Sequence, residues 1–243
     1  MAGKPNYHYI WIGAVVLVFG IWFVPRIADR IREDRVVDDR RTPAGPDAEP
    51  LAYITLDGQR RKVPAFALLD QDSLLITDKD YRGKVYVAEF FFTTCPTICP
   101  VMTRNLVELQ DELADEPDFG VASFTINPRY DSPSRLKAYA ERHGITDMDW
   151  HLLTGDRDTI YDLANAGFNI FAAEMPDVPG GFEHSGLFAL IDRDGYLRSR
   201  KDRFGNPLVY YRGTITREDG ENNAGETEQI SLLKEDILKL LEE

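Results

Sequence analysis

The clearest hydrophobic pattern in the chain is a nearly continuous apolar run over residues 84–92, KVYVAEFFF. A short run of this kind, rich in aromatic and β-branched residues, indicates a central strand that is buried on both faces. Further strands are predicted over residues 119–126 and 150–153. Apolar residues recur at helical spacing over 101–113, 134–143 and 156–166, and prolines at 100 and 133 are well placed to open the first two helices.

The last third of the chain continues this alternation of elements. Residues 187–192, LFALID, are followed by the turn Arg193-Asp194-Gly195 and by an extended run over 196–199, which predicts a hairpin. Residues 214–227 are polar and predict a loop without chemistry, and residues 230–241 form an amphipathic pattern that predicts a closing helix. The whole pattern predicts an α/β fold, with a sheet covered by helices on both faces.

The amino-terminal region differs in kind from this domain. Residues 9–24 carry no charge and have aromatic residues at both ends, so after a tail over 1–8 we predict a transmembrane anchor over 9–25. The run is longer than the apolar core of about 7–15 residues in a cleaved signal peptide, and no Ala-x-Ala site follows it. Residues 26–49 are charged and then rich in proline, glycine and alanine, which predicts a linker to a domain over 50–243.

Charge narrows the choice of partner and leaves the orientation open. The chain of 243 residues has a formal net charge of −13, and the first 49 residues contain equal numbers of acids and bases, so the whole excess lies on the domain. Such a surface repels nucleic acid and attracts cations or a basic partner, although it also serves solubility alone. Six arginines follow the apolar segment and only Lys4 precedes it, which by the positive-inside rule places the domain in the cytoplasm.

Candidate chemistry is concentrated at Cys95 and Cys99, the only cysteines in the chain. Each precedes a proline, which disfavours a regular helix interior, and the loop between them enters a helix at the end where the dipole favours thiolate. Three intervening residues leave room for a metal ion between the reduced sulfurs, and a disulfide remains possible on oxidation. Thiolates select Cu(I), zinc or iron–sulfur clusters, whereas structural zinc normally requires four ligands. The pair is therefore a redox pair, a metal pair or both.

A histidine is the natural candidate for a further ligand. His8 lies at the predicted membrane edge, His143 ends a predicted helix and His151 lies in a short strand, so we predict structural roles for these three. His184 lies in a predicted loop over 180–186, directly before the strand at 187–192. Because sites in open α/β sheets form at strand ends, this loop can approach the one that carries the thiols.

Several motifs, in order along the chain, resemble the Sco/SenC family of copper-binding assembly factors for cytochrome c oxidase. FFFTTCPTICP resembles the family's F-x-F-T-x-C-P-x-x-C-P, and TINPRYDSPSRLKAY, WHLLTGD and EHSGLFALIDRDG resemble three further family segments. The resemblance spans roughly residue 64 to the end and implies a thioredoxin-like fold. By position it implies copper ligation by Cys95, Cys99 and His184, with His184-Ser185 in the place of the thioredoxin cis-proline turn.

The resemblance also implies a function. It implies a membrane-anchored copper chaperone that requires no catalytic turnover and assists assembly of the oxidase copper site, with the oxidase's copper-bearing subunit and a copper donor protein as partners. It further implies a domain on the periplasmic side or an equivalent, against the arginine count, since long domains translocate largely regardless of flanking charge.

Two alternatives belong to other functional classes. In the first, the cysteine pair is a thiol–disulfide oxidoreductase that reduces the cysteines of the oxidase, and His184 is expendable. The second is peroxide reduction of the peroxiredoxin kind, which requires a Thr-x-x-Cys motif. Phe92 occupies the threonine position here, which argues against that reading.

One position departs from the family pattern. Asn127 stands where the family has an aspartate before Pro128, whereas Asp131 keeps the second acid of the motif. A role of the missing carboxylate in copper tuning or docking is therefore in doubt. For Asp131 we weigh a cap on the following helix against a role at the site.

Overall fold

A computed structural model describes residues 17, 19, 50–202 and 204–243. Chain contacts divide the protein into two units, Met1–Arg41 and Thr42–Glu243. In the first unit, the described residues are Leu17 and Phe19, both helical and exposed. The rest of the predicted anchor at 9–25 and the linker at 26–49 lie outside the described residues. Among the residues that are described, no helix has the length and apolarity needed to cross a membrane.

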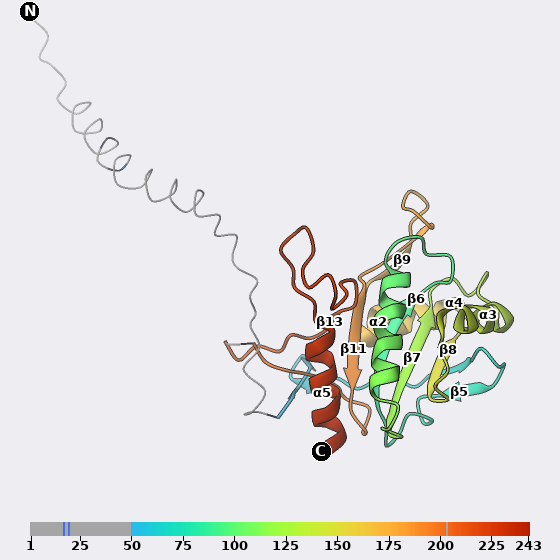
Figure 1. Ribbon diagram of the computed structural model, residues 1–243, viewed down its shortest axis with the longest axis horizontal. Helices are drawn as coiled ribbons and strands as arrows, with labels where there is room; N and C mark the ends of the chain where they lie inside the picture. Colours follow the sequence, from blue (N-terminus) through green and yellow to red (C-terminus); the bar gives the residue numbers. More distant parts are fainter. Residues whose placement is uncertain (1–16, 18, 20–49, 203) are drawn as a thin grey trace, which may run out of the picture. The chain divides into compact units, whose positions relative to one another are not determined.

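A mixed sheet forms the centre of the second unit (Figure 1). Strands β6 (Val85–Phe91), β7 (Phe119–Thr125) and β8 (Trp150–Leu153) run parallel, and β11 (Leu187–Ile191) pairs antiparallel with β6. Strands β12 (Leu197–Ser199) and β13 (Tyr211–Arg212) pair with β11, and β1 (Ala52–Tyr53) pairs with β12 at the edge. Every residue of β6 and β7 is buried, which confirms the prediction from their apolar runs.

Helices lie near their predicted positions. These are α2 (Cys99–Glu112), α3 (Pro133–His143), α4 (Arg157–Asp162) and α5 (Ile230–Glu242). Proline stands in the first turn of both α2 and α3, as predicted. The helix predicted over 156–166 is regular only to Asp162, because the chain then widens into the π-helix η1 (Leu163–Phe168). Apolar periodicity alone does not distinguish these two windings.

An aromatic contact anchors helical structure on each face of the sheet. On one face, the Phe91 ring packs 5.4 Å from Tyr139 of α3, whose hydroxyl bonds Thr103 of α2 at 2.7 Å. On the other, Phe90 lies 5.6 Å from Phe168 of η1. Because side chains alternate across a strand, neighbouring phenylalanines anchor helices on opposite faces. The prediction of a sheet covered on both faces is confirmed.

Short ribbons complete the fold, and their pairing was not predicted. Strands β2 (Thr55–Leu56) and β3 (Gln59–Arg60) pair together, as do β4 (Ala67–Leu69) and β5 (Leu75–Thr77). The segment 180–186, predicted as a loop, contains strand β10 (Phe182–His184), which pairs antiparallel with β9 (Ala172–Glu174). The loop prediction is therefore wrong over Phe182–His184, because three residues after two glycines are too short a run to show a strand pattern.

Candidate metal centre

The two cysteines lie where β6 passes into α2. Cys95 lies in the connecting loop, and its N–H donates to the carbonyl of Phe92 at 3.1 Å, which closes a tight turn. Cys99 is the first residue of α2, and its N–H donates to Sγ of Cys95 at 3.4 Å. The helix therefore directs a backbone donor at one sulfur from its positive end, which favours negative charge on that sulfur.

The two thiols differ in their access to solvent and in their acidity. Cys95 is 9% exposed and Cys99 only 1%, and both are present as thiols. Burial raises the pKa of the Cys99 thiol well above its ordinary value, and the adjacent Cys95 and the charge of Glu89 act in the same direction. For Cys99, burial therefore opposes the thiolate that the helix end favours.

The chain segment that carries His184 packs against the cysteine loop on both sides of the histidine. Before it, the Phe182 ring lies 5.1 Å from that of Phe92. After it, a Cβ on Gly186 would lie 3.2 Å from Ile98 and would also collide with Thr214, so only glycine fits, and its φ of +65° suits glycine as well. The predicted approach of this segment to the thiols is thus present in the backbone.

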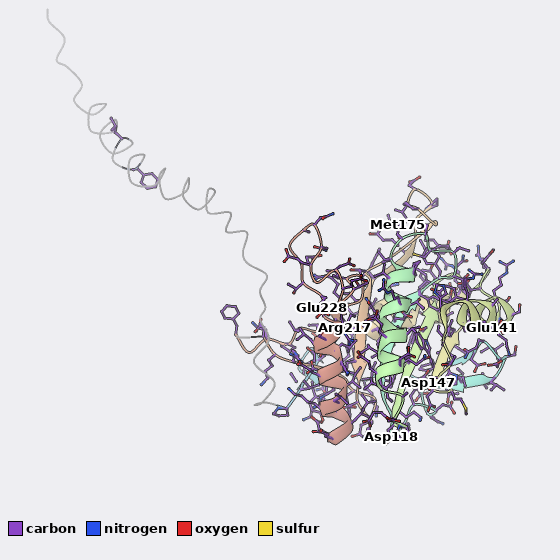
Figure 2. The ribbon with its side chains drawn as sticks, in the orientation of Figure 1. Asp118, Glu141, Asp147, Met175, Arg217 and Glu228 are labelled. Atoms are coloured by element: carbon purple, nitrogen blue, oxygen red, sulfur yellow. The ribbon has the colours of Figure 1, made fainter. Side chains whose placement is uncertain are left out.

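The ligand set itself remains a prediction. The backbone of His184 pairs with Ala172 in the β9–β10 hairpin, whose turn begins at Met175 (Figure 2). The side chain of His184 lies outside the described part of the structure. Among the described side chains, no group of three or more histidine, cysteine or acidic residues is arranged to hold a metal ion. Two soft sulfur donors side by side nevertheless fit a thiophilic ion such as Cu(I).

Asp131 holds the cysteine loop through hydrogen bonds. Its carboxylate is fully buried and accepts the N–H of Thr93 at 3.0 Å, and it also accepts the hydroxyls of Thr93 and Thr125. The N-cap of α3 is Ser132, and it has no side-chain cap. The capping role considered for Asp131 is therefore wrong, and the carboxylate instead joins the residues just before Cys95 to the end of β7.

Asn127, which stands where the family pattern has an aspartate, helps to form the turn before Asp131 through its backbone. Its N–H donates to the hydroxyl of Thr125 at 3.1 Å, and its carbonyl accepts the N–H groups of Tyr130 and Asp131. The turn that presents Asp131 to the cysteine loop therefore forms without a carboxylate at position 127.

Glu89 is a buried acid that the sequence reasoning missed. It is 1% exposed, Oε1 accepts the hydroxyl of Ser123 at 2.7 Å, and Oε2 has no hydrogen-bond partner. Burial raises the pKa of this carboxyl to about 7, although the Ser123 hydrogen bond opposes the shift. A charged residue within the run KVYVAEFFF was the available signal, because an acid inside a doubly buried strand requires a reason.

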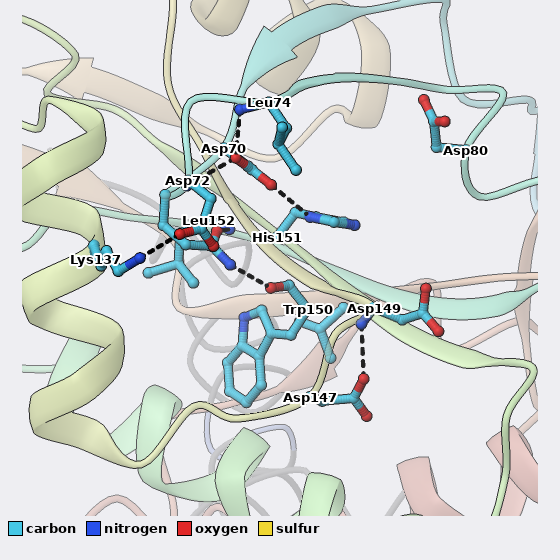
Figure 3. A network of polar contacts seen from close by, with 12 residues as sticks. Asp70, Asp72, Leu74, Asp80, Lys137, Asp147, Asp149, Trp150, His151 and Leu152 are labelled. Atoms are coloured by element: carbon cyan, nitrogen blue, oxygen red, sulfur yellow. Dashed lines mark hydrogen bonds and ion pairs between the residues drawn. The ribbon is translucent and has the colours of Figure 1, made fainter.

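The histidines predicted to be structural include two that are described. His151 of β8 places Nδ1 3.1 Å from Oδ2 of Asp70, whose Oδ1 accepts the N–H of Leu74 (Figure 3). This pair joins β8 to the turn between β4 and β5. His143 packs its ring 4.2 Å from Tyr139, and burial lowers its pKa. Both contacts agree with structural roles, and His8 lies outside the described residues.

Fold and cysteine placement together define a class of protein. A mixed sheet flanked by helices, with a cysteine pair between a central strand and the helix that follows it, is the thioredoxin-like fold. The family model SCO1/SenC matches residues 55–212. The chain belongs to the SCO1/SenC family.

Individual relatives agree with this assignment. The SCO1 protein homolog of Bacillus subtilis is 32% identical over 136 residues, which cover 55% of this chain and 70% of the relative. The solved structure of BsSco, a member of the Sco family of cytochrome c oxidase assembly proteins, is 25% identical with a TM-score of 0.61, over 79% of this chain and 98% of that one. ScoI of Bradyrhizobium japonicum, solved with copper bound, shares the fold at 24% identity and a TM-score of 0.50, over 65% of this chain and 94% of that one.

Proposed function

We propose that this chain binds one copper ion through Cys95, Cys99 and His184 and assists assembly of the copper site of cytochrome c oxidase. The observation that carries the proposal is the packing of the His184 segment, through Phe182 and Gly186, on the loop that holds the two thiols. Membership of a family with copper-bound and oxidase-assembly members supports it.

Each of the three proposed ligands would have a different role in binding the ion. Cys99 would supply a buried sulfur that gives up its proton when metal binds, since metal affinity requires the thiolate. Cys95 would supply the more exposed sulfur, whose charge the Cys99 N–H stabilises. His184 would add the nitrogen ligand, and a copper ion bound in this way is cargo to be passed on by exchange of ligands.

Copper titration of the reduced full-length chain tests this proposal. We expect one equivalent of Cu(I) to bind in competition with a chelator. The His184→Ala variant should bind Cu(I) more than about a hundredfold more weakly. Loss of a group that only supports a metal ligand lowers affinity by at most about a hundredfold, and loss of a ligand itself should lower it further. His143→Ala, which removes a half-buried imidazole elsewhere, serves as the matched control. Equal affinity for His184→Ala and the parent would remove His184 from the ligand set.

Thiol–disulfide exchange is the second candidate function. The contact of the Cys99 N–H with Sγ of Cys95 supports it, because the two cysteines lie side by side and could react in turn. In this case His184→Ala should leave the reduction of a partner disulfide unchanged, whereas either cysteine-to-serine variant should abolish a full cycle. The effect of His184→Ala therefore distinguishes the two candidate functions.

We also propose that residues 9–25 anchor the chain in a membrane and that the domain faces the extracytoplasmic side. The uncharged apolar run supports the anchor. The six arginines that follow it predict the opposite orientation. Protease treatment of intact spheroplasts decides between them, because only an extracytoplasmic domain is digested without lysis.

A further inference from the structure

A small apolar pocket lies directly beside the more exposed thiol. It has a volume of about 220 Å³, and Cys95 is one of the residues that line it. Its apolar walls come from the cysteine loop on one side and the β9–β10 hairpin on the other: Phe92, Ile98, Val178, Pro179 and Phe182. Buried Cys99 is not among the residues that line it. Whatever enters this pocket therefore meets Cys95 first.

The size of the pocket limits what can occupy it. Sites for small organic ligands usually enclose about 300–1,000 Å³, so this pocket is suited to one or two apolar side chains. A polypeptide segment can place one such side chain in the pocket and hold a neighbouring cysteine next to Sγ of Cys95. Disulfide exchange requires contact between the two sulfurs. Ligand exchange requires that both sulfurs reach the same metal ion.

Charge around the pocket selects further among thiols. Glu183 lines the pocket and is exposed, and Asp177 is exposed on the turn of the same hairpin. The chain as a whole has a formal charge of −13. Anionic thiols such as glutathione are repelled by this surface, whereas a neutral or basic segment is not.

We propose that this pocket is the docking site for a cysteine-bearing segment of the partner protein, with an apolar residue next to the cysteine and no net negative charge. The inference rests on the proposed function, in which the partner receives copper or electrons from the cysteine pair. It assigns Cys95 as the sulfur that the partner reaches, and the hairpin turn around Val178 as the element that selects the partner.

The chemical step on which the test depends is disulfide exchange with a disulfide supplied by a peptide. Cys95 loses its proton to solvent, and its sulfur bonds to one peptide sulfur while the peptide S–S bond breaks. The second peptide sulfur leaves and takes up a proton from solvent. Cys99 then loses its proton to solvent and bonds to Cys95, which releases the first peptide sulfur as a thiol. Two thiols of the chain are oxidised and one peptide disulfide is reduced, so two electrons are transferred.

The experiment compares exchange rates of the reduced full-length chain with three disulfides. These are an end-blocked, uncharged Leu-Cys-Gly dimer, glutathione disulfide and bis(2-hydroxyethyl) disulfide, which is neutral and has no side chain for the pocket. We expect the peptide to react at least about tenfold faster than the hydroxyethyl reference, which is the scale on which an apolar pocket discriminates. Glutathione disulfide should react more slowly than the reference. A parent chain that reacts equally fast with all three overturns the proposal.

Variants of the hairpin locate the effect in the pocket. Val178→Asp puts a carboxylate into the pocket, and Pro176→Asp adds the same charge to the same turn away from its lining. Val178→Asp should lower the ratio of peptide to reference rate to about one, within the range set by loss of an apolar contact, and Pro176→Asp should keep the parent ratio. Pro179→Asp, on the exposed rim, should act like Val178→Asp and is the second variant if that chain does not fold. Equal ratios in the pocket variants and Pro176→Asp contradict the docking site.

Copper titration of the same variants separates this inference from the proposed function. Unchanged Cu(I) affinity in Val178→Asp, together with a lost rate ratio, supports docking as a role distinct from metal binding. A parent chain that keeps the rate ratio but binds no copper overturns the copper function and leaves the pocket as a docking site for disulfide exchange alone.

Discussion

The carboxylate of Asp131 accepts the backbone N–H of Thr93 at 3.0 Å, two residues before Cys95. Thr93 and Thr125 also donate their hydroxyls to the same carboxylate, so the cysteine loop is tied to the end of β7. This relationship makes Asp131 a positioning residue for the thiols although it lies 36 residues along the chain from Cys95.

Asp131→Asn should therefore loosen the cysteine loop. An amide has one acceptor oxygen and turns its NH₂ group toward donors, so at least one buried donor loses its partner, at a cost to the free energy of unfolding of about 1–3 kcal/mol. Urea denaturation measures that loss, and the alkylation rate of Cys95 should rise in the folded variant. Thr93→Val, which removes one hydroxyl donor to the carboxylate and keeps the backbone N–H bond, is the control and should change both quantities less. An unchanged alkylation rate in Asp131→Asn would limit this carboxylate to a purely structural role.

Glu89→Gln should make the reduced, metal-free protein less sensitive to pH. The folded pKa of Glu89, about 7, lies above the ordinary value of 4.5, so the folded state binds the proton more tightly than the unfolded state. Stability from this group is complete below pH 4.5 and is lost as the pH rises through 7. The difference in free energy of unfolding, variant minus parent, should be on the order of 3 kcal/mol more favourable to the variant at pH 8 than at pH 4.

Urea denaturation of parent and variant across this pH range measures the effect. Glu141→Gln, the same change at an exposed acid (Figure 2), is the matched control for the substitution itself. A pH-independent difference for Glu89→Gln would show that the Glu89 carboxyl titrates in the folded protein as it does in the unfolded chain.

The two thiols should react with alkylating agents at different rates. Cys95 is the more exposed, and burial raises the pKa of Cys99, so both its poor access and its raised pKa slow the reaction of Cys99. Mass spectrometry of the reduced protein after brief treatment with iodoacetamide should find Cys95 modified at least about tenfold faster. The single variants Cys95→Ser and Cys99→Ser give the rate of each remaining thiol alone. Faster modification of Cys99 would reverse the assigned order.

Phe182→Ala should weaken copper binding without unfolding the domain. The Phe182 ring fixes the β9–β10 hairpin against Phe92, and aromatic pairs of this kind contribute about 0.5–1.5 kcal/mol beyond their buried area. Loss of the contact should lower Cu(I) affinity by about tenfold, the effect expected when a group that orients a ligand is removed. Phe171→Ala, which removes an exposed ring next to the same hairpin, should leave the affinity unchanged. A Phe182→Ala chain with parental affinity would mean that the hairpin does not orient the histidine.

Sequence reasoning succeeded where local pattern and burial coincide. The apolar run at 84–92 predicted the buried strand β6, and proline marked the start of α2 and of α3. It failed where a short strand has too little pattern of its own. Strand β10 is three residues long and follows two glycines, so neither its pairing with β9 nor the contact of Phe182 with Phe92 is visible in the sequence.

The site divides along the same line. The two closely spaced cysteines and the prolines beside them predicted the loop that carries the sulfurs, because this motif is local in sequence. The partners of Asp131 are 38 and 6 residues away, so its role in holding the loop depended on the folded chain. Glu89 was visible as an acid in an apolar run, but its unpartnered oxygen depends on the packing of α2 and α3 against the sheet.

The hairpin that carries residue 184 pairs, among the residues described, only within itself and adds no rung to the seven-stranded sheet. Its turn can therefore be lengthened or shortened between Met175 and Gly181 without shifting the register of any strand in that sheet. Protein engineers could thus alter the turn beside Cys95 while leaving the scaffold that holds the sulfurs unchanged.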